Sequence, residues 1–302
     1  MQPITITAAD GYRLSATYFE GHTSAPGTIV ISSATGVKKE FYLNFARYLV
    51  RKGYTVLLYD YRGIGGSAPR RLKTSKAYMH EWGTKDMNAV LNWLVAEKSC
   101  IDIIWIGHSI GGQLFGFLEK KQHLKKVITV NAGLGYWGNF AFPMNIKIGA
   151  LWYIVAPLLI TIHGYGSVKK LGWGEDLPGN VLREWRKWCI NKNYFMALLQ
   201  KKLNARSFHD FNVPITAVYT NDDFIATDKT IARMMEFFPN APIDIIKIPV
   251  SKYTHHKAGH TGLFRKRFEN SLWPLLAAMI DNKETVVQHS TFTSQVFETI
   301  EA

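Results

Sequence analysis

The sequence predicts an α/β protein with a mostly parallel central sheet, helices on both faces of that sheet, and an inserted, mainly helical cap. Short apolar runs with the length of buried strands alternate with segments whose apolar residues recur at helical spacing. This alternation is typical of parallel strands joined by right-handed crossovers. It stops between Ala132 and Asn212, which indicates an insertion. With 302 residues, 47% of them apolar, the chain suits one core that carries such an insertion.

The elements can be placed in order from periodicity. The apolar runs 4–7 and 14–19 flank Asp10-Gly11, a hairpin signal, and are expected to form the antiparallel edge of the sheet. Further along, the pattern predicts strands at 28–32, 55–59, 103–106, 127–131 and 215–219, and helices at 40–52, 81–97, 112–118 and 264–280.

One glycine-rich turn lies between a predicted strand and a predicted helix. Gly107-His108-Ser109-Ile110-Gly111 follows the run 103–106 and precedes the segment 112–118. The flanking glycines permit a strained backbone at the central residue, so that Ser109 Oγ stands clear at the end of the sheet. Because the bare pattern should arise by chance in roughly one such chain in ten, the surrounding strand and helix carry the argument. Ser109 is the candidate nucleophile, and an inert turn serine is the alternative.

A nucleophile in such a turn is followed along the chain by an acid and then by a histidine. His260 lies in the glycine-flanked loop Ala258-Gly259-His260-Thr261-Gly262, from which a side chain can reach back to Ser109, and it is the candidate base. His255 and His256 are the rival pair, for which a solvated loop is the commoner interpretation. His289 falls in a polar tail and is discounted.

The acid is expected at the C-terminal end of the strand 215–219, where functional groups of parallel sheets collect. That end carries Thr220-Asn221-Asp222-Asp223. Asp223 is preferred as the group that holds the tautomer of His260 and stabilises its imidazolium. Asp222 stays as the alternate, since a pattern does not resolve one residue, and either could be an ordinary turn aspartate.

Strand, serine turn, aspartate loop and Gly-His loop in this order resemble the α/β-hydrolase superfamily over nearly the whole chain. A little-characterised group of bacterial predicted α/β hydrolases of the serine hydrolase type is the most similar. The motifs that carry this second resemblance are Ser33-Ala34-Thr35-Gly36-Val37, Asp60-Tyr61-Arg62-Gly63-Ile64-Gly65-Gly66-Ser67, Glu175-Asp176-Leu177-Pro178 with Glu184-Trp185, and Gly259-His260-Thr261-Gly262-Leu263-Phe264-Arg265.

The chain departs from the superfamily pattern after its third strand. Many members carry a His-Gly pair there, whereas Thr28–Ser32 leads into Ser33-Ala34-Thr35-Gly36. Stabilising an oxyanion needs only backbone N–H groups, so the missing side chain is tolerable. The resemblance implies donors from Thr35 and Ile110, with an offset of one residue or a plain turn at 33–36 as alternatives.

The resemblance implies a serine hydrolase, of the carboxylesterase or lipase type, that cleaves an ester of an apolar or acyl substrate through an acyl-enzyme on Ser109. A thioester or an amide is a less favoured substrate. An acyltransferase would use the same triad while excluding water. No cofactor and no metal is expected, and a dehalogenase is disfavoured because it needs a carboxylate where Ser109 stands.

The domain organisation follows from the interrupted alternation. Residues 1–132 and 213–281 are expected to form the two parts of the core, 133–212 the cap, and 282–302 a polar C-terminal tail. The cap holds five of the nine tryptophans, and aromatic caps suit apolar substrates. Within it, residues 146–162 are almost wholly apolar. At about 17 residues they are expected to be a buried or interfacial cap segment rather than a transmembrane helix.

The net charge of +13 is the feature that hydrolysis explains least. It could attract anionic lipid, acidic substrates or nucleic acid, but the basic clusters are scattered and nucleic acid is not favoured as a partner. Together with the apolar cap segment, this charge suggests a further alternative function, a catalytically inactive hydrolase-fold protein that binds lipid at a membrane surface. Residues 1–10 have no signal-peptide pattern, and Cys100 and Cys189 suggest free thiols, so a cytoplasmic location is expected. The sequence leaves the oligomeric state open.

Overall fold

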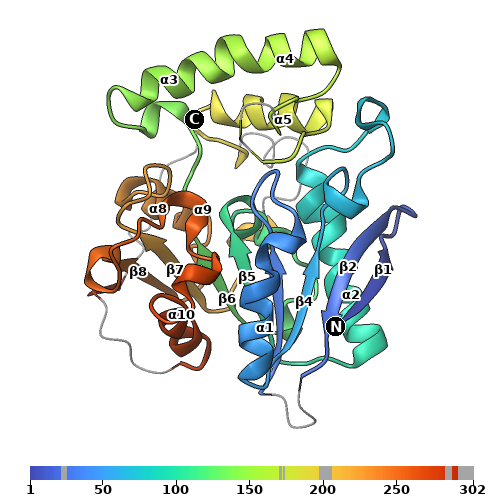
Figure 1. Cartoon of the computed structure of the whole chain (residues 1–302), viewed down its shortest axis with the longest axis vertical. Helices are drawn as coiled ribbons and strands as arrows, with labels where there is room; N and C mark the ends of the chain where they lie inside the picture. Colours follow the sequence, from blue (N-terminus) through green and yellow to red (C-terminus); the bar gives the residue numbers. More distant parts are fainter. Residues whose placement is uncertain (22–25, 170–171, 173, 197–205, 283–287, 292–302) are drawn as a thin grey trace.

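The computed structural model has one mostly parallel sheet with helices against both faces and a helical layer at one end of the molecule (Figure 1). It describes residues 1–21, 26–169, 172, 174–196, 206–282 and 288–291. Within these residues nine strands are ordered β1-β2-β4-β3-β5-β6-β7-β8-β9. The predicted fold class is confirmed.

The strands are β1 (Gln2–Thr7), β2 (Arg13–Phe19), β3 (Thr28–Ser32), β4 (Thr55–Tyr59), β5 (Ile103–His108), β6 (Leu124–Val130), β7 (Ile215–Thr220), β8 (Ile243–Ile248) and β9 (Gln288–Thr291). The α-helices are α1 (Leu43–Arg51), α2 (Asn88–Lys98), α3 (Met144–Ala150), α4 (Ala156–His163), α5 (Gly179–Cys189), α7 (Arg206–His209), α8 (Asp228–Met235), α9 (Gly259–Gly262) and α10 (Trp273–Ile280). The π-helical segments are η4 (Trp82–Met87) and η9 (Leu151–Val155).

The strands from β4 to β8 in the sheet order run parallel. At one edge β1 and β2 form the antiparallel hairpin that the Asp10-Gly11 signal predicts. Every residue of β3, β4, β5 and β7 is buried, as expected for strands covered on both faces. Side chains of α1 and α10 share the core on one face, and those of α2 and α8 share the core on the other.

The far edge of the sheet differs from the sequence expectation. The pattern did not single out β8, and β9 pairs antiparallel with β8 inside the segment 282–302 that was expected to be a polar tail. Residues 283–287 and 292–302 of that tail lie outside the described residues. His289, discounted as a base, lies in β9 opposite Ile246 at the edge of the sheet.

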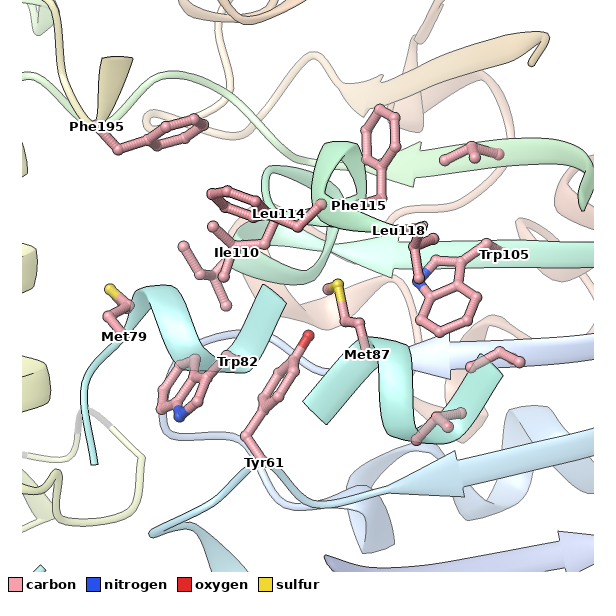
Figure 2. Close-up of a cluster of buried hydrophobic side chains, with 14 of the residues drawn as sticks. Tyr61, Met79, Trp82, Met87, Trp105, Ile110, Leu114, Phe115, Leu118 and Phe195 are labelled. Atoms are coloured by element: carbon pink, nitrogen blue, oxygen red, sulfur yellow. The ribbon is translucent and has the colours of Figure 1, made fainter. Parts of the chain in front are cut away.

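Large side chains fill the core between the sheet and α2 (Figure 2). Trp105 of β5 is fully buried there, and the rings of Tyr61 and Trp82 stack with centroids 4.7 Å apart. Phe195 from the cap belongs to the same cluster as Ile110, the residue that follows the candidate nucleophile. The apolar core is therefore continuous from the sheet to the cap.

A buried ion pair fixes the loop that follows β4. Arg62 Nε lies 2.7 Å from Asp86 Oδ1, and the Arg62 backbone N–H donates to Asp86 Oδ2 at 2.8 Å. Both side chains are almost completely buried, whereas Asp10, which also contacts the Arg62 guanidinium, is one-third exposed. This accounts for Arg62 within the Asp60–Ser67 motif as a structural residue.

Replacing Asp86 by alanine is expected to lower the free energy of unfolding by about 3–5 kcal/mol, because the buried Arg62 guanidinium would lose its fully buried partner and keep only the more exposed Asp10 and Glu81. Urea unfolding followed by circular dichroism measures the change. The Asp10→Ala variant is the control and is expected to lose no more than about 1 kcal/mol, since its pair with Arg62 is partly solvated. Equal losses in the two variants would contradict this account.

The segment between β6 and β7 contains α3, η9, α4, α5 and α7 and covers one end of the core (Figure 1). Hydrogen bonds of Glu184 and Glu175 hold this segment on the core. The Glu184 carboxylate of α5 accepts from the His80 ring and from the His80 backbone N–H, at 2.8 and 3.0 Å, and the Glu175 N–H donates to Gly36 O at 2.7 Å. Of the cap tryptophans, Trp152 and Trp188 are buried, Trp137 and Trp185 are half-buried, and Trp173 lies outside the described residues.

The apolar segment 146–162 forms one continuous helix, made of α3, η9 and α4. The helix Met144–His163 has 20 residues and a mean hydropathy of 1.6, and is long and apolar enough to cross a membrane. Only 22% of its apolar stretch is buried inside the protein, so of the two alternatives expected for this segment, buried or interfacial, the buried one is wrong.

The prediction of a helix at 112–118 is wrong. Its place is taken by two short 3₁₀ turns, η5 (Ser109–Gly112) and η6 (Phe115–Phe117). Gly112 and Gly116 lie so close to neighbouring atoms that a Cβ on either would fall 2.6 Å or less from them. Glycine also disfavours an α-helix by about 1 kcal/mol relative to alanine.

The helix predicted at 264–280 is also wrong in its extent. Only Trp273–Ile280, α10, is α-helical, and it is preceded by the 3₁₀ turn Lys266–Phe268. Pro274 explains the boundary, because proline has no N–H to donate and fits only the first turn of a helix.

Candidate active site

The turn after β5 has the strained geometry that its glycines predict. Ser109 has a φ of +52°, in the left-handed region that L-residues rarely adopt. A Cβ on Gly107 would lie 2.3 Å from Gly111 O, and a Cβ on Gly111 would lie 2.4 Å from Ser32 O. Only glycine fits at both positions, so the backbone closes tightly around Ser109 and directs its side chain out of the sheet.

Ser109, His260 and Asp223 form one hydrogen-bonded chain. His260 Nε2 lies 2.9 Å from Ser109 Oγ, and His260 Nδ1 lies 2.7 Å from Asp223 Oδ2. Because a carboxylate only accepts, Nδ1 carries the proton and donates it to Asp223, which leaves Nε2 to accept from the Ser109 hydroxyl. The structure thus brings together the three residues that the sequence predicts, in the orientation needed for His260 to take a proton from Ser109.

The two neighbouring aspartates have different partners. Asp223 is buried, and its second oxygen accepts from the Ile225 N–H at 2.7 Å, which fixes the carboxylate. Asp222 instead accepts from the N–H groups of Ala258 and Gly259, at 2.7 and 3.0 Å. Asp223 therefore contacts the histidine ring, whereas Asp222 anchors the loop that carries it.

The rival histidines line another part of the surface. His255 and His256 are exposed and line a shallow hollow of about 370 Å³ together with Ser251, Lys252, Tyr253 and Thr254. No hydrogen bond from either imidazole ring to Ser109 is present among the described residues. The structure does not bring this pair into the site.

Two buried residues that the sequence reasoning missed hold the His260 loop in place. Asn131, directly after β6, donates from Nδ2 to the carbonyl oxygens of Gly259 and His260, at 3.1 and 2.9 Å. His108 lies 2.9 Å from His260 O through Nε2 and 2.7 Å from Tyr42 Oη through Nδ1. Since a carbonyl only accepts, Nε2 of His108 is the protonated nitrogen. Both residues lie at the C-terminal ends of predicted parallel strands, and this position could have marked them in the sequence as residues near the site.

His108 is a neutral, fully buried histidine. Burial is the largest cause that lowers the pKa of His108, from 6.5 to about 3, and the nearby His260 acts in the same direction. Burial likewise raises the pKa of Tyr42, whose hydroxyl accepts from the Ala34 N–H and can donate to His108 Nδ1. A hydrogen-bonded chain therefore links the loop after β3 to the loop of the base.

A His108→Gln variant is expected to have a flatter dependence of stability on pH. Between pH 6.5 and about 3 the unfolded chain binds a proton that the folded chain excludes, so stability falls as the pH falls. In this range His108 alone makes the free energy of unfolding fall by about 1.4 kcal/mol for each pH unit. Above pH 6.5 the histidine is neutral in both the folded and the unfolded chain, so it causes no loss of stability there. Urea unfolding across this range measures the slope, and equal slopes in the two proteins would contradict the buried neutral state.

The predicted oxyanion donors lie in the two loops that follow the C-terminal ends of the neighbouring central strands β3 and β5. Ser32 of β3 pairs with Gly107 of β5, and Thr35 and Ile110 each follow three residues later. The N–H groups in the first turn of a helix lack intrahelical acceptors, which applies to Ile110 in η5. Thr35 and Ile110 remain candidates, because a role in binding an oxyanion needs a substrate to define it.

No group of three or more histidine, cysteine, aspartate or glutamate side chains among the described residues could hold a metal ion. A hydroxyl hydrogen-bonded to an imidazole, as at Ser109, can give up its proton and act as a nucleophile.

Comparison with known families gives a match over most of the chain. The family model described as "Serine aminopeptidase, S33" matches residues 23–238. Two uncharacterised 31.7 kDa proteins of the traX-finO intergenic region of Escherichia coli are each 28% identical over 126 residues. That stretch is 40% of this chain and 42% of each relative, so the chain matches less than half the length of these curated proteins.

Solved structures share the fold at low sequence identity. An esterase from Exiguobacterium antarcticum superposes with a TM-score of 0.59 at 14% identity, with coverage of 93% of this chain and 100% of that one. The mouse α/β hydrolase domain-containing protein 10 gives a TM-score of 0.57 at 13% identity, with coverage of 93% and 99%. At these identities the likeness is one of fold.

Proposed function

Because the chain belongs to the serine aminopeptidase S33 family of α/β hydrolases, we propose that it is a serine hydrolase that cleaves esters of apolar acyl groups. One observation carries the proposal. Ser109, His260 and Asp223 are joined by hydrogen bonds of 2.9 and 2.7 Å at a strained turn. This arrangement suits a hydroxyl that is activated by a neighbouring base.

In the proposed reaction Ser109 Oγ attacks the ester carbonyl carbon while its proton passes to His260 Nε2. Asp223 stabilises the imidazolium, and the N–H groups of Thr35 and Ile110 bind the oxyanion. The intermediate collapses, the bond to the alcohol oxygen breaks, and that oxygen takes the proton from His260. Water then attacks the acyl-enzyme with His260 again as base, which releases the acid and restores Ser109.

The surroundings of the site favour an apolar acyl group over the amino terminus of a peptide. Ile110, the residue after Ser109, belongs to the same buried apolar cluster as Leu134 and the cap side chains Trp152, Val181 and Phe195. A charged amino group would lose its hydration against such side chains without a compensating partner. Ester cleavage is therefore proposed ahead of the aminopeptidase activity in the family description.

Labelling of the purified protein by a fluorophosphonate probe, with mass spectrometry of the modified peptide, tests this function. We expect labelling at Ser109 that the Ser109→Ala and His260→Ala substitutions abolish. We also expect turnover of p-nitrophenyl butyrate and octanoate, and none of aminoacyl p-nitroanilides. Transfer of the acyl group to an added alcohol in preference to water would identify an acyltransferase instead.

The matched controls are His256→Ala, which removes an exposed histidine of the same loop, and Ser251→Ala, which removes an exposed serine. Both variants are expected to be labelled like the parent. Absence of labelling in a parent protein with native circular dichroism would overturn the proposal. Labelling that survives in the Ser109→Ala variant would do the same.

We also propose a cytoplasmic location. Cys100 and Cys189 are both unpaired, and Cys189 is buried. Free thiols are the ordinary state of cysteines in a reducing compartment, which supports the proposal.

A further inference from the structure

The outermost element of the cap presents an apolar face to solvent. In Figure 1 the helix made of α3, η9 and α4 lies across one end of the longest axis of the molecule, with α5 beneath it. Its inner side packs on the cap through the buried residues Gly149, Trp152, Ala156 and Ile160. Its outer side carries an exposed ridge at a spacing of four residues, made of Ile146, Ala150, Ile154, Leu158 and Ile162.

This ridge is apolar along its whole length. Ile146 and Ile154 are each 59% exposed and Ile162 is 70% exposed, and Phe142 and Tyr153 extend the same surface. We call this surface the cap ridge; its seven residues are Phe142, Ile146, Ala150, Tyr153, Ile154, Leu158 and Ile162. Single exposed apolar residues are ordinary, but a continuous strip on one helix indicates a surface that binds a partner.

The topology rules out insertion of this helix across a bilayer. It lies between β6 and β7, which pair side by side in one sheet. A helix that spanned the membrane once at this point would place the two halves of that sheet on opposite sides. The backbone is also tied to the cap, because Arg186 Nε donates to Trp152 O at 2.6 Å. The helix can therefore only lie along a membrane surface.

Basic groups surround the cap ridge. Lys147 is exposed on the helix itself, and the Arg186 guanidinium lies 5.9 Å from the Tyr153 ring. At the C-terminal end of α4, a Cβ on Gly164 would lie 3.7 Å from Lys73 Cβ, which places the loop after β4 against this end of the helix. That loop exposes Arg70, Arg71, Lys73 and Lys76, and the sequence has no acidic residue from 61 to 80 or from 120 to 174.

We propose that the cap ridge docks the protein on the surface of an anionic lipid bilayer. The apolar side chains enter the boundary between headgroups and acyl chains, and the neighbouring lysines and arginines contact the anionic headgroups. The helix lies in the plane of the membrane, with the cap between the bilayer and the sheet. The proposal does not depend on the proposed hydrolysis, since it needs neither Ser109 nor His260.

A second copy of the chain is the rival occupant of the cap ridge. In an isologous pair the cap ridges of two copies would face each other and bring the basic groups around both ridges into one interface, where their charges would repel. An anionic membrane turns the same charges into an attraction. Charge therefore favours the lipid surface.

The test is sedimentation of the full-length Ser109→Ala variant with vesicles of phosphatidylcholine alone or mixed with phosphatidylglycerol. We expect binding to the mixed vesicles that weakens with added salt. The Ile154→Ser/Leu158→Ser variant is expected to lower the partition coefficient by about 30-fold or more, because two exposed apolar side chains are lost. Replacing Arg70, Arg71 and Lys73 by glutamine is expected to lower it by about 5-fold per residue at low salt.

The matched control is Ile101→Ser, which removes an isoleucine that is 69% exposed and lies two residues before β5, away from the cap. It is expected to bind like the parent. Absence of binding by the parent, or equal binding by the Ile154→Ser/Leu158→Ser variant, would overturn the proposal. So would a dimer in sedimentation velocity that this double substitution dissociates, since a second copy would then cover the ridge. Retention of the protein in vesicles after a high-salt and carbonate wash would also overturn the proposal, because a protein docked on the membrane surface is removed by such a wash.

Discussion

The Ser109→Ala and His260→Ala variants are each expected to hydrolyse an ester about a million-fold more slowly in kcat than the parent, and the double variant no more slowly still. Ser109 Oγ and His260 Nε2 are 2.9 Å apart and take part in the same proton transfer. Removing either group therefore removes the function of the other, and the two losses do not add. KM is expected to change little, because neither side chain supplies the apolar contacts that bind the acyl group.

Initial rates with p-nitrophenyl butyrate measure this effect, with the double variant as the background. The His256→Ala control is expected to stay within about twofold of the parent, since His256 is exposed and lines a hollow that does not include Ser109. A His260→Ala variant that keeps more than about a hundredth of the parent rate would contradict its role as the base. Losses that multiply in the double variant would contradict a single catalytic unit.

The residues of the candidate site could be chosen from the sequence because chain order constrains them. A serine in a glycine turn after a buried strand, an aspartate after a later strand and a histidine after that have few matches in one chain. Chain order did not decide whether Asp222 or Asp223 is the acid. Only the hydrogen bonds distinguish them, since Asp223 contacts the imidazole ring of His260 and Asp222 contacts the backbone of the same loop.

Other parts of the molecule were beyond the sequence pattern for physical reasons. His108 and Asn131 support the site through buried hydrogen bonds to the loop at residues 259–260, about 130 to 150 residues away, a distance over which periodicity carries no information. The exposure of the segment 146–162 could not be predicted either, because the sequence of an apolar run is the same whether its side chains are buried or exposed. The helix expected at 112–118 is absent because close packing around Gly112 and Gly116 decides the backbone there, and the start of the helix expected at 264–280 was misplaced because Pro274 has no N–H to donate.

The Asp223→Asn variant is expected to lose about ten-thousand-fold in kcat while it keeps its stability within about 1 kcal/mol. Asp223 Oδ2 accepts the Nδ1 proton of His260 at 2.7 Å, which presents the unprotonated Nε2 to Ser109. An amide that donates to Nδ1 would move the ring proton to Nε2, and that nitrogen could no longer accept from the Ser109 hydroxyl. The rate of fluorophosphonate labelling is expected to fall with kcat, because both report the nucleophilicity of Ser109.

The Asp222→Asn variant is the matched control, since it makes the same chemical change at the adjacent residue. Asp222 holds the N–H groups of Ala258 and Gly259, so we expect a loss of about 1–3 kcal/mol in unfolding free energy and a kcat within about tenfold of the parent. Steady-state kinetics and urea unfolding on both variants give the two readouts. The opposite result, with the large loss of kcat at Asp222, would assign the acid to that residue. Similar losses of kcat in both variants would mean that the position of the loop, rather than the tautomer of His260, limits the reaction.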